Sequence, residues 1–217
     1  MKKYLLSLAA LALTATPALA HHPLGGMPME TFAHGLLSGI GHPILGFDHL
    51  FFIAIVGIAA LYTGRALMAP GAYIAAMLVG CLMMSFGAGL PVKEAVIGLS
   101  LLVVGGIVLS GRALGLVPAL VLFAAFGLFH GSAFGDAMAQ QEATGGTAVL
   151  VGYLIGLGVV QYVIAIGAGW LAKTVWNAAE ASAIQPRLAG AVVAGVGIYL
   201  TLENAEGFVF DLLKWSA

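Results

Sequence analysis

Residues 41–52 place two histidines and an aspartate at the start of an apolar run that continues to residue 62. A carboxylate such as Asp48 that faces lipid costs at least about 2.5 kcal/mol, so such groups normally face a bundle interior, a partner or an ion. Imidazole nitrogens, here those of His42 and His49, suit divalent nickel, cobalt, copper and zinc, and a carboxylate completes such a site. We therefore interpret this stretch as one wall of a path for a metal ion.

The spacing of the two histidines limits how they can share an ion. His42 and His49 are seven residues apart, which is roughly 10 Å along the axis of a continuous helix. Ligand bonds of about 2 Å do not bridge that distance. Either His42 forms an outer entry site and Asp48 with His49 a deeper one, or the helix is unwound between them, which Pro43 and Gly46 permit. Asp48 and His49 point about 100° apart on a helix, so one can ligate while the other orients a neighbour.

His130 is a further candidate, in a segment where Gly127, Gly131 and Gly135 recur every four residues. Glycines at this spacing let membrane helices approach closely, so we interpret them as packing residues that also help helices converge on one ion. The candidate metal-handling residues are His42, Asp48, His49, His130, His21, His22, Asp136 and Glu203.

Several of these residues have structural alternatives. His42 before a proline can cap a helix at the headgroup level. Asp48 can be a structural partner of His130, and His130 itself can be a packing histidine with satisfied hydrogen bonds. His34 is interpreted as an interfacial surface residue. The sequence leaves these alternatives open.

The composition predicts a membrane protein. Of the 217 residues, 61% are hydrophobic and only 8% are charged, whereas about 25% of residues are charged in a soluble domain. We expect an all-α, polytopic membrane protein. The net charge of -1 gives no sign of a nucleic-acid partner, and a single cysteine, Cys81, excludes an intrachain disulfide.

The first twenty residues are typical of a secretory signal peptide. Lys2 and Lys3 precede a short apolar run, Pro17 breaks it, and small residues lie at the -3 and -1 positions of a cleavage point after Ala20. The alternative is an uncleaved first membrane helix. Cleavage would expose His21 at the mature terminus, where its free amine and the imidazoles of His21 and His22 make a compact nitrogen chelator for capturing a metal outside the cytoplasm.

The remaining chain divides into three parts. Residues 21–41 are a periplasmic leader followed by an amphipathic helix over 29–40, which is expected to lie at the outer membrane surface or to extend the first span. Residues 42–203 form a bundle of about six transmembrane helices, and 204–217 form a short amphipathic periplasmic tail. The predicted spans are 43–62, 66–90, 95–110, 114–134, 147–172 and 187–203, with a polar loop over 136–146 between the fourth and fifth.

Loop charges predict the orientation. With the mature N-terminus outside, the inner segments carry four Lys or Arg residues and the outer segments two, in agreement with the positive-inside rule. Both termini are then periplasmic. In this orientation span one begins outside and spans four and six end outside. His42, Asp48 and His49 therefore lie on the outer side together with His130, Asp136 and Glu203.

These motifs resemble a known family. The pattern His42-Pro43-x-x-Gly46-x-Asp48-His49-x-x-Phe52, with Phe-His-Gly-x-Ala-x-Gly over 129–135, resembles the hydrogenase/urease accessory permeases called HupE/UreJ. The resemblance covers nearly the whole chain. It implies import of nickel, and in some members cobalt, to supply metalloenzymes, with metal handling by His42, Asp48, His49 and His130.

The second motif departs from the family pattern as it is usually written. A second histidine and a nearby glutamate often follow the first histidine, whereas Phe134 and Ala137 stand at those places here, with Asp136 one position earlier. The metal chemistry of this segment is therefore expected to differ.

We expect a bacterial inner-membrane permease for a divalent transition metal, with Ni²⁺ as the transported ion and Co²⁺ possible. We expect no catalytic residues and no organic cofactor. No nucleotide-binding motif is visible, so the energy must come from a gradient, the membrane potential or trapping of the metal. Two alternatives stay open: an intramembrane zinc-dependent hydrolase with Asp48 as base, and a membrane metal-binding protein without transport. The sequence leaves the oligomeric state open.

Overall fold

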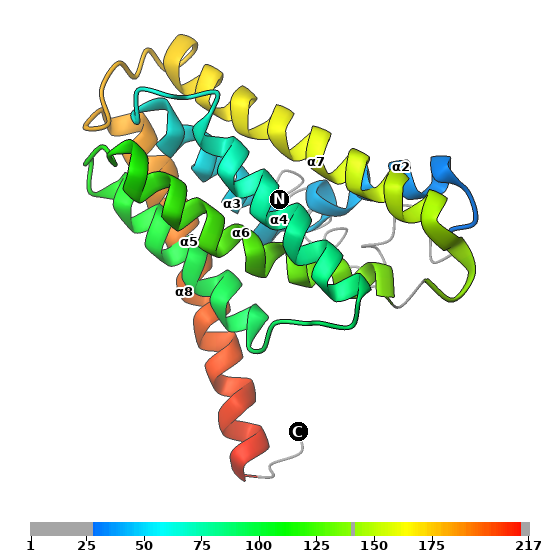
Figure 1. Ribbon diagram of the computed structural model, residues 1–217. Coiled ribbons are helices and arrows are strands. Elements are labelled where there is room, and N and C mark those ends of the chain that lie inside the picture. The colour runs from blue at the N-terminus through cyan, green and yellow to red at the C-terminus, as the bar shows by residue number, and fades with distance from the viewer. Residues whose placement is uncertain (1–27, 140–141, 214–217) are drawn as a thin grey trace, which may run out of the picture.

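The structure is a computed structural model that describes residues 28–139 and 142–213, and all regular elements in these ranges are helices. The helices are α2 (Phe32–Leu45), α3 (Phe47–Leu61), α4 (Ala69–Ser85), α5 (Lys93–Leu109), α6 (Leu116–Ala139), α7 (Glu142–Thr174) and α8 (Ile184–Leu213). They form a bundle from which the C-terminal part of α8 extends (Figure 1). The all-helical prediction is confirmed.

Helix α3 is the centre of the bundle. It contacts each of the other described helices, and an unbroken run from Ile55 to Ala60 is buried on all sides. The principal pairs around it are α4 with α6, α5 with α8, and α2 with α7. A helix that is apolar all round is expected in such a central position. The first residues of α3 therefore lie where several helices meet.

The chain breaks between α2 and α3, at Gly46. Gly46 has an extended backbone, with φ -85° and ψ 99°, and the two helices are bent by 81°. The predicted first span from residue 43 is therefore wrong at its start, because α2 continues through Pro43 to Leu45. Of the two arrangements left open for His42 and His49, the structure has the unwound one.

Helix α2 packs against α7 through its small residues. Gly35, Ser38 and Gly39 are buried, while Phe32 and Leu37 of the apolar stripe are 43% and 53% exposed. The reason is close backbone packing, since a Cβ added at Gly35 would lie 2.1 Å from the Val149 carbonyl oxygen of α7. Small residues make such approaches between membrane helices, and larger side chains are left outside.

The prediction of six spans is supported in part. Among the described residues, α6, α7 and α8 are each long and apolar enough to cross a membrane, and α2 with α3 adds a fourth if the bent pair is one span. The predicted second and third spans correspond to α4 and α5, which have 17 residues each. A helix of that length reaches about 25 Å, less than the roughly 30 Å of a hydrocarbon core.

Two predicted boundaries are also corrected. Asp136 is helical, because α6 continues to Ala139, so the polar loop expected over 136–146 is much shorter. Residues 204–213 continue α8 without a break and do not form a separate tail.

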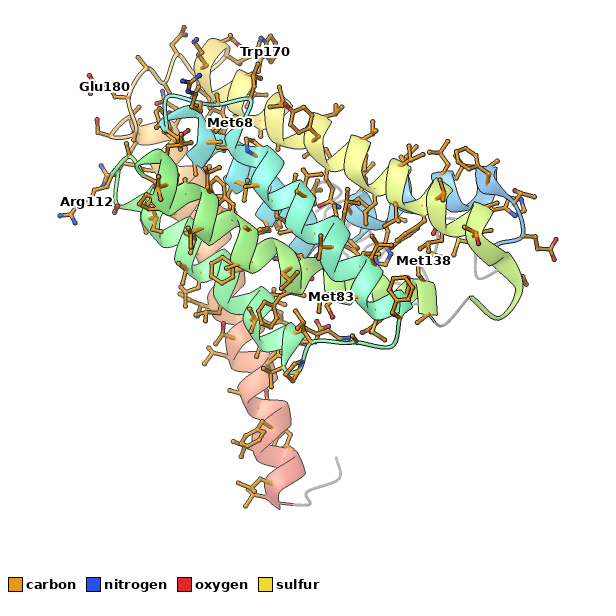
Figure 2. The ribbon with its side chains drawn as sticks, in the orientation of Figure 1. Met68, Met83, Arg112, Met138, Trp170 and Glu180 are labelled. Atoms are coloured by element: carbon orange, nitrogen blue, oxygen red, sulfur yellow. The ribbon has the colours of Figure 1, made fainter. Side chains whose placement is uncertain are left out.

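Along the bundle, Arg112 and Glu180 lie at one end, and Met83 and Met138 lie toward the other (Figure 2).

The glycines of α6 bring its backbone against α4. A Cβ at Gly131 would lie 1.9 Å from the Met77 carbonyl oxygen, and one at Gly127 would lie 2.6 Å from the Tyr73 carbonyl oxygen. Because real Cβ contacts with backbone atoms are never this short, the two helices must separate if a side chain is added. The packing interpretation of these glycines is confirmed.

Gly131→Ala is expected to destabilise the bundle by about 1–3 kcal/mol through overpacking. This corresponds to a fall of about 2–12 °C in Tm for a chain of this size. The measurement is thermal unfolding in detergent, read by a thiol-reactive dye at the buried Cys81. Gly106→Ala is the matched control, since no atom lies within 4 Å of a Cβ at that helical position. Equal Tm values for the two variants would contradict the prediction.

Candidate metal-ion site

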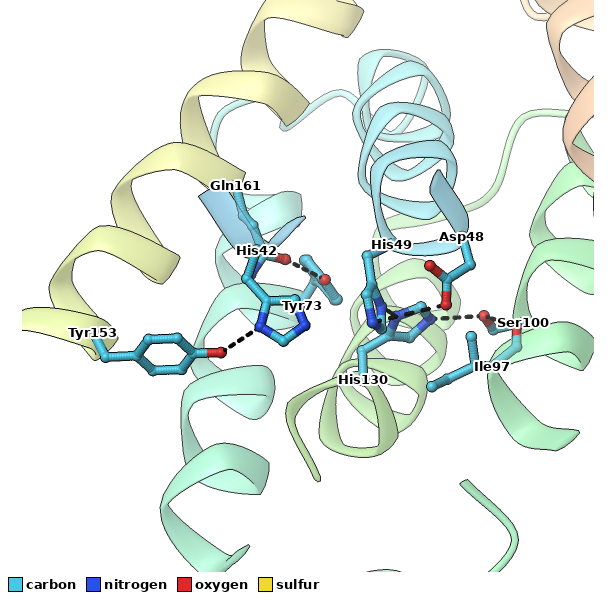
Figure 3. A network of polar contacts seen from close by, with 9 residues as sticks. All are labelled: His42, Asp48, His49, Tyr73, Ile97, Ser100, His130, Tyr153 and Gln161. Carbon is cyan, nitrogen blue, oxygen red and sulfur yellow. Dashed lines mark hydrogen bonds and ion pairs between the residues drawn. The ribbon is translucent and has the colours of Figure 1, made fainter. Parts of the chain in front are cut away.

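Three histidines meet where α3 begins, and we call His42, His49 and His130 the histidine cluster. The His49 and His130 rings are linked by a 2.8 Å contact between their Nδ1 atoms. On its other side His130 Nε2 lies 2.9 Å from Ser100 Oγ of α5 (Figure 3). His130 is fully buried and both its ring nitrogens are engaged. In this arrangement His130 holds the ring of His49.

Asp48 gives the cluster its negative charge. Its Oδ2 lies 3.7 Å from His49 Nε2, and the Asp48 side chain is 28% exposed against 9% for His49. Ligand bonds of about 2 Å to nitrogen and to oxygen span at most about 4 Å, so one cation can touch both atoms. The carboxylate is therefore the more accessible of the two candidate ligand groups.

His42 joins the cluster from α2. Its ring centroid lies 6.2 Å from that of His49, closer than the roughly 10 Å rise of seven residues on a straight helix. Its Nδ1 lies 3.0 Å from the hydroxyl oxygen of Tyr153 on α7, and that hydroxyl also donates to the Phe134 carbonyl oxygen at 3.2 Å. The break at Gly46 and the anchor on α7 together bring the two imidazoles close.

Aromatic rings enclose the cluster. Phe52 stacks on His130 with centroids 4.2 Å apart, and Phe134 lies 4.2 Å from His49 and 5.1 Å from His42. Both phenylalanines are fully buried. Phe134 is the residue that stands where the family pattern often has a second histidine, so an imidazole at this position would lie against both rings. The apolar wall strengthens charge interactions at Asp48, because it excludes water.

A second polar pair lies deeper in the bundle. The Tyr73 hydroxyl donates to the Gln161 side-chain oxygen, and Gln161 Nε2 donates to Met77 Sδ at 3.6 Å. All three side chains are fully buried. The Tyr73 ring lies 6.2 Å from that of His130. This pair links α4 to α7 just beyond the histidine cluster.

The acidic candidates have other partners. Asp136 forms an ion pair with Lys93, and Glu203 accepts a hydrogen bond from the Tyr199 hydroxyl at 3.2 Å on the exposed face of α8. Glu203 and Glu94 line a groove of about 930 Å³ between the start of α5 and α8.

His34 is the one remaining histidine among the described residues, and it lies at the start of α2. His21 and His22 lie outside the described residues. His34 Nδ1 accepts a hydrogen bond from the backbone N–H of Glu30 at 3.3 Å, at the start of α2. Within residues 28–139 and 142–213, no group of three or more His, Cys, Asp or Glu side chains is arranged to enclose a metal ion. The described site is therefore a pair of candidate ligand side chains, Asp48 and His49, of which His49 is oriented by its contact with His130.

Two comparisons with known proteins identify the family of this chain. Residues 9–200 match the sequence model of the family described as HupE / UreJ protein. The chain belongs to the HupE/UreJ family. It is 30% identical over 201 residues to Protein HupE of Rhizobium leguminosarum bv. viciae. The aligned region covers 91% of this chain and 98% of that protein. No solved structure matches the chain.

Within this HupE/UreJ chain, sequence reasoning missed two residues of the site. Ser100 and Tyr153 lie in apolar helices at ordinary helical positions, and only the fold shows that they anchor His130 and His42. Side chains that orient ligands carry no spacing pattern of their own, because their partners come from other helices.

Proposed function

We propose that this protein is a permease that imports a divalent transition metal across the bacterial inner membrane, nickel in the first place and cobalt in the second. The imported ion would serve the maturation of metalloenzymes. Membership of the HupE/UreJ family and the apolar helical bundle support this proposal. The observation that carries it is the Asp48–His49 pair, which lies at the head of the central helix with His49 held from behind by His130.

In this proposal Asp48 Oδ2 and His49 Nε2 bind the ion, and His42 meets it on the approach side. Water completes the coordination shell. Conduction requires binding that is strong enough for entry and weak enough for release. Two protein ligands at the edge of an aromatic enclosure satisfy this requirement better than a closed cage. His130 and Ser100 act behind the ligands, and Tyr73 with Gln161 lies next along the bundle.

We further propose that α3 to α8 are six spans with both termini periplasmic. The loops after α3 and α5 contain Arg65 and Arg112, and Lys173 lies in the last turn of α7. The positive-inside rule predicts a cytoplasmic location for these ends. The bilayer can thin around the short helices α4 and α5 at modest cost. Asp136 and Glu203 then contribute negative charge at the outer face, which concentrates cations there.

The membrane potential is a sufficient driving force in this scheme. A doubly charged ion that moves inward gains roughly 4–5 kcal/mol at 100 mV. After cleavage of residues 1–20, His21 and His22 would capture the metal outside and deliver it to His42. The bilayer and the metal ion are the partners that this function needs.

The proposal is tested by uptake of radioactive ⁶³Ni²⁺ into proteoliposomes that contain the purified full chain. We expect accumulation that rises when the interior is made negative with a potassium gradient and valinomycin. An excess of Ni²⁺ should suppress the signal most, Co²⁺ less and Zn²⁺ least. Liposomes without protein are the control. Retention of a stoichiometric amount of metal, unaffected by potential, would show a binding protein and overturn the permease.

A further inference from the structure

The hydroxyl of Ser100 fixes the direction of a chain of hydrogen bonds. Ser100 Oγ lies 2.7 Å from the Ile97 carbonyl oxygen and donates to it. A carbonyl oxygen only accepts and a hydroxyl has a single hydrogen, so this hydrogen is committed. The contact of 2.9 Å between Ser100 Oγ and His130 Nε2 must then be a bond in which His130 Nε2–H donates.

The same reasoning carries through the two imidazoles. A neutral His130 that is protonated on Nε2 has a lone pair on Nδ1. The 2.8 Å contact between the Nδ1 atoms of His49 and His130 therefore has His49 as the donor. With its hydrogen on Nδ1, neutral His49 carries its lone pair on Nε2, the nitrogen that lies 3.7 Å from Asp48 Oδ2.

We propose that Ser100 is a positioning residue that, through His130, fixes the ring hydrogen of His49 on Nδ1 and keeps the Nε2 lone pair available to a divalent cation held with Asp48. This inference rests on the proposed function only for the identity of the bound cation. Ser100 touches neither the ion nor its ligands. Because its only hydrogen is donated to the Ile97 carbonyl oxygen, the Ser100 hydroxyl can only accept from His130 Nε2–H. The reverse direction of the hydrogen-bond chain is thereby excluded.

Without the hydroxyl the chain can reverse. In Ser100→Ala, the His130 Nε2–H loses its acceptor in a fully buried position, so His130 gains by carrying its hydrogen on Nδ1 and donating to His49 Nδ1. His49 then carries its own hydrogen on Nε2, which faces Asp48. A metal ion must displace this arrangement before it binds.

The first test compares Ser100→Ala with Ser110→Ala in the proteoliposome assay. Ser110 makes the same bond within α5, to the Ile107 carbonyl oxygen at 2.6 Å, but is exposed. We expect the KM for Ni²⁺ to rise about 10- to 100-fold in Ser100→Ala, with kcat changed much less, and to remain near the wild-type value in Ser110→Ala. Ser100→Thr keeps a hydroxyl and should recover most of the affinity. Equal KM values in the two alanine variants overturn the proposal.

The second test reads the hydrogens directly and needs no transport. In full-length protein labelled with ¹⁵N-histidine in nanodiscs, without metal, the wild type should show His49 protonated on Nδ1 and His130 on Nε2. The assignment should reverse in Ser100→Ala. A wild-type His49 with its hydrogen on Nε2 overturns the proposal even if no variant folds. If the hydrogens lie where we predict but the protein does not transport Ni²⁺, the proposed role of Ser100 stands and only the permease function is overturned.

Discussion

Asp48→Asn is expected to reduce ⁶³Ni²⁺ uptake by at least about 100-fold in kcat/KM. The substitution keeps the volume and removes the charge that faces His49 Nε2 at 3.7 Å. Two unit charges 4 Å apart interact by about 4 kcal/mol at an effective dielectric constant of about 20, and a divalent ion gains more. Since 1.4 kcal/mol corresponds to a factor of ten, a loss of about 3 kcal/mol already reaches this effect. The measurement is initial uptake rate against Ni²⁺ concentration.

Two carboxylates provide matched controls for this experiment. Asp136→Asn changes a carboxylate that is paired with Lys93 and does not touch the histidine cluster, so uptake should fall less than about fivefold. Glu180→Gln changes an exposed residue between α7 and α8 and should have no effect. If Asp136→Asn proves as damaging as Asp48→Asn, the outer charge as a whole matters more than the Asp48–His49 pair.

Gly46→Ala is expected to weaken Ni²⁺ affinity by about 10- to 100-fold, the range seen when the surround of a metal ligand is disturbed. The reason is steric. A Cβ at Gly46 would lie 2.9 Å from His49 Cδ2 and 3.2 Å from Asp48 Oδ1. The His49 ring cannot yield easily, because its Nδ1 is held by His130 and Phe134 lies against its face. The measurement is KM for Ni²⁺ in proteoliposomes.

The backbone at Gly46 tolerates other residues, since its φ of -85° is ordinary. The expected loss therefore comes from the side chain alone, and Gly46→Val should be worse than Gly46→Ala. Gly167→Ala on α7 is the control, because a Cβ there has no atom within 4 Å. A Gly46→Ala protein with wild-type affinity would show that the ion does not need the observed positions of Asp48 and His49.

The sequence predicted the parts of this structure that depend on composition and short periodicity. Apolar runs separated by polar links predicted the helices α3 to α8, and glycines four residues apart predicted the contact of α6 with α4. The convergence of His42, His49 and His130 was predicted from the alternation of spans, and the structure brings these three rings together. These features follow from local rules that act within one helix or between neighbouring helices.

Other features depend on contacts between distant segments and had no local signal. The apolar stripe of α2 gave no signal that Gly35 and Gly39 pack this helix against α7. The ion pair of Asp136 with Lys93, which comes from another helix, had no signal in the sequence. The engagement of both nitrogens of His130 likewise depends on Ser100, 30 residues away. Periodicity cannot rank such competing partners.

The attachment of the His42 and His49 imidazoles to different helix pairs has a mechanical consequence. His42 belongs to α2 and is held by Tyr153 of α7, whereas His49 is held by His130 of α6. If the α2–α7 pair shifts as a rigid body against the rest of the bundle, both anchoring bonds survive while the gap between His42 and His49 widens. Such a shift must break the bond from the Tyr153 hydroxyl to the Phe134 carbonyl oxygen, which joins the two bodies at this point.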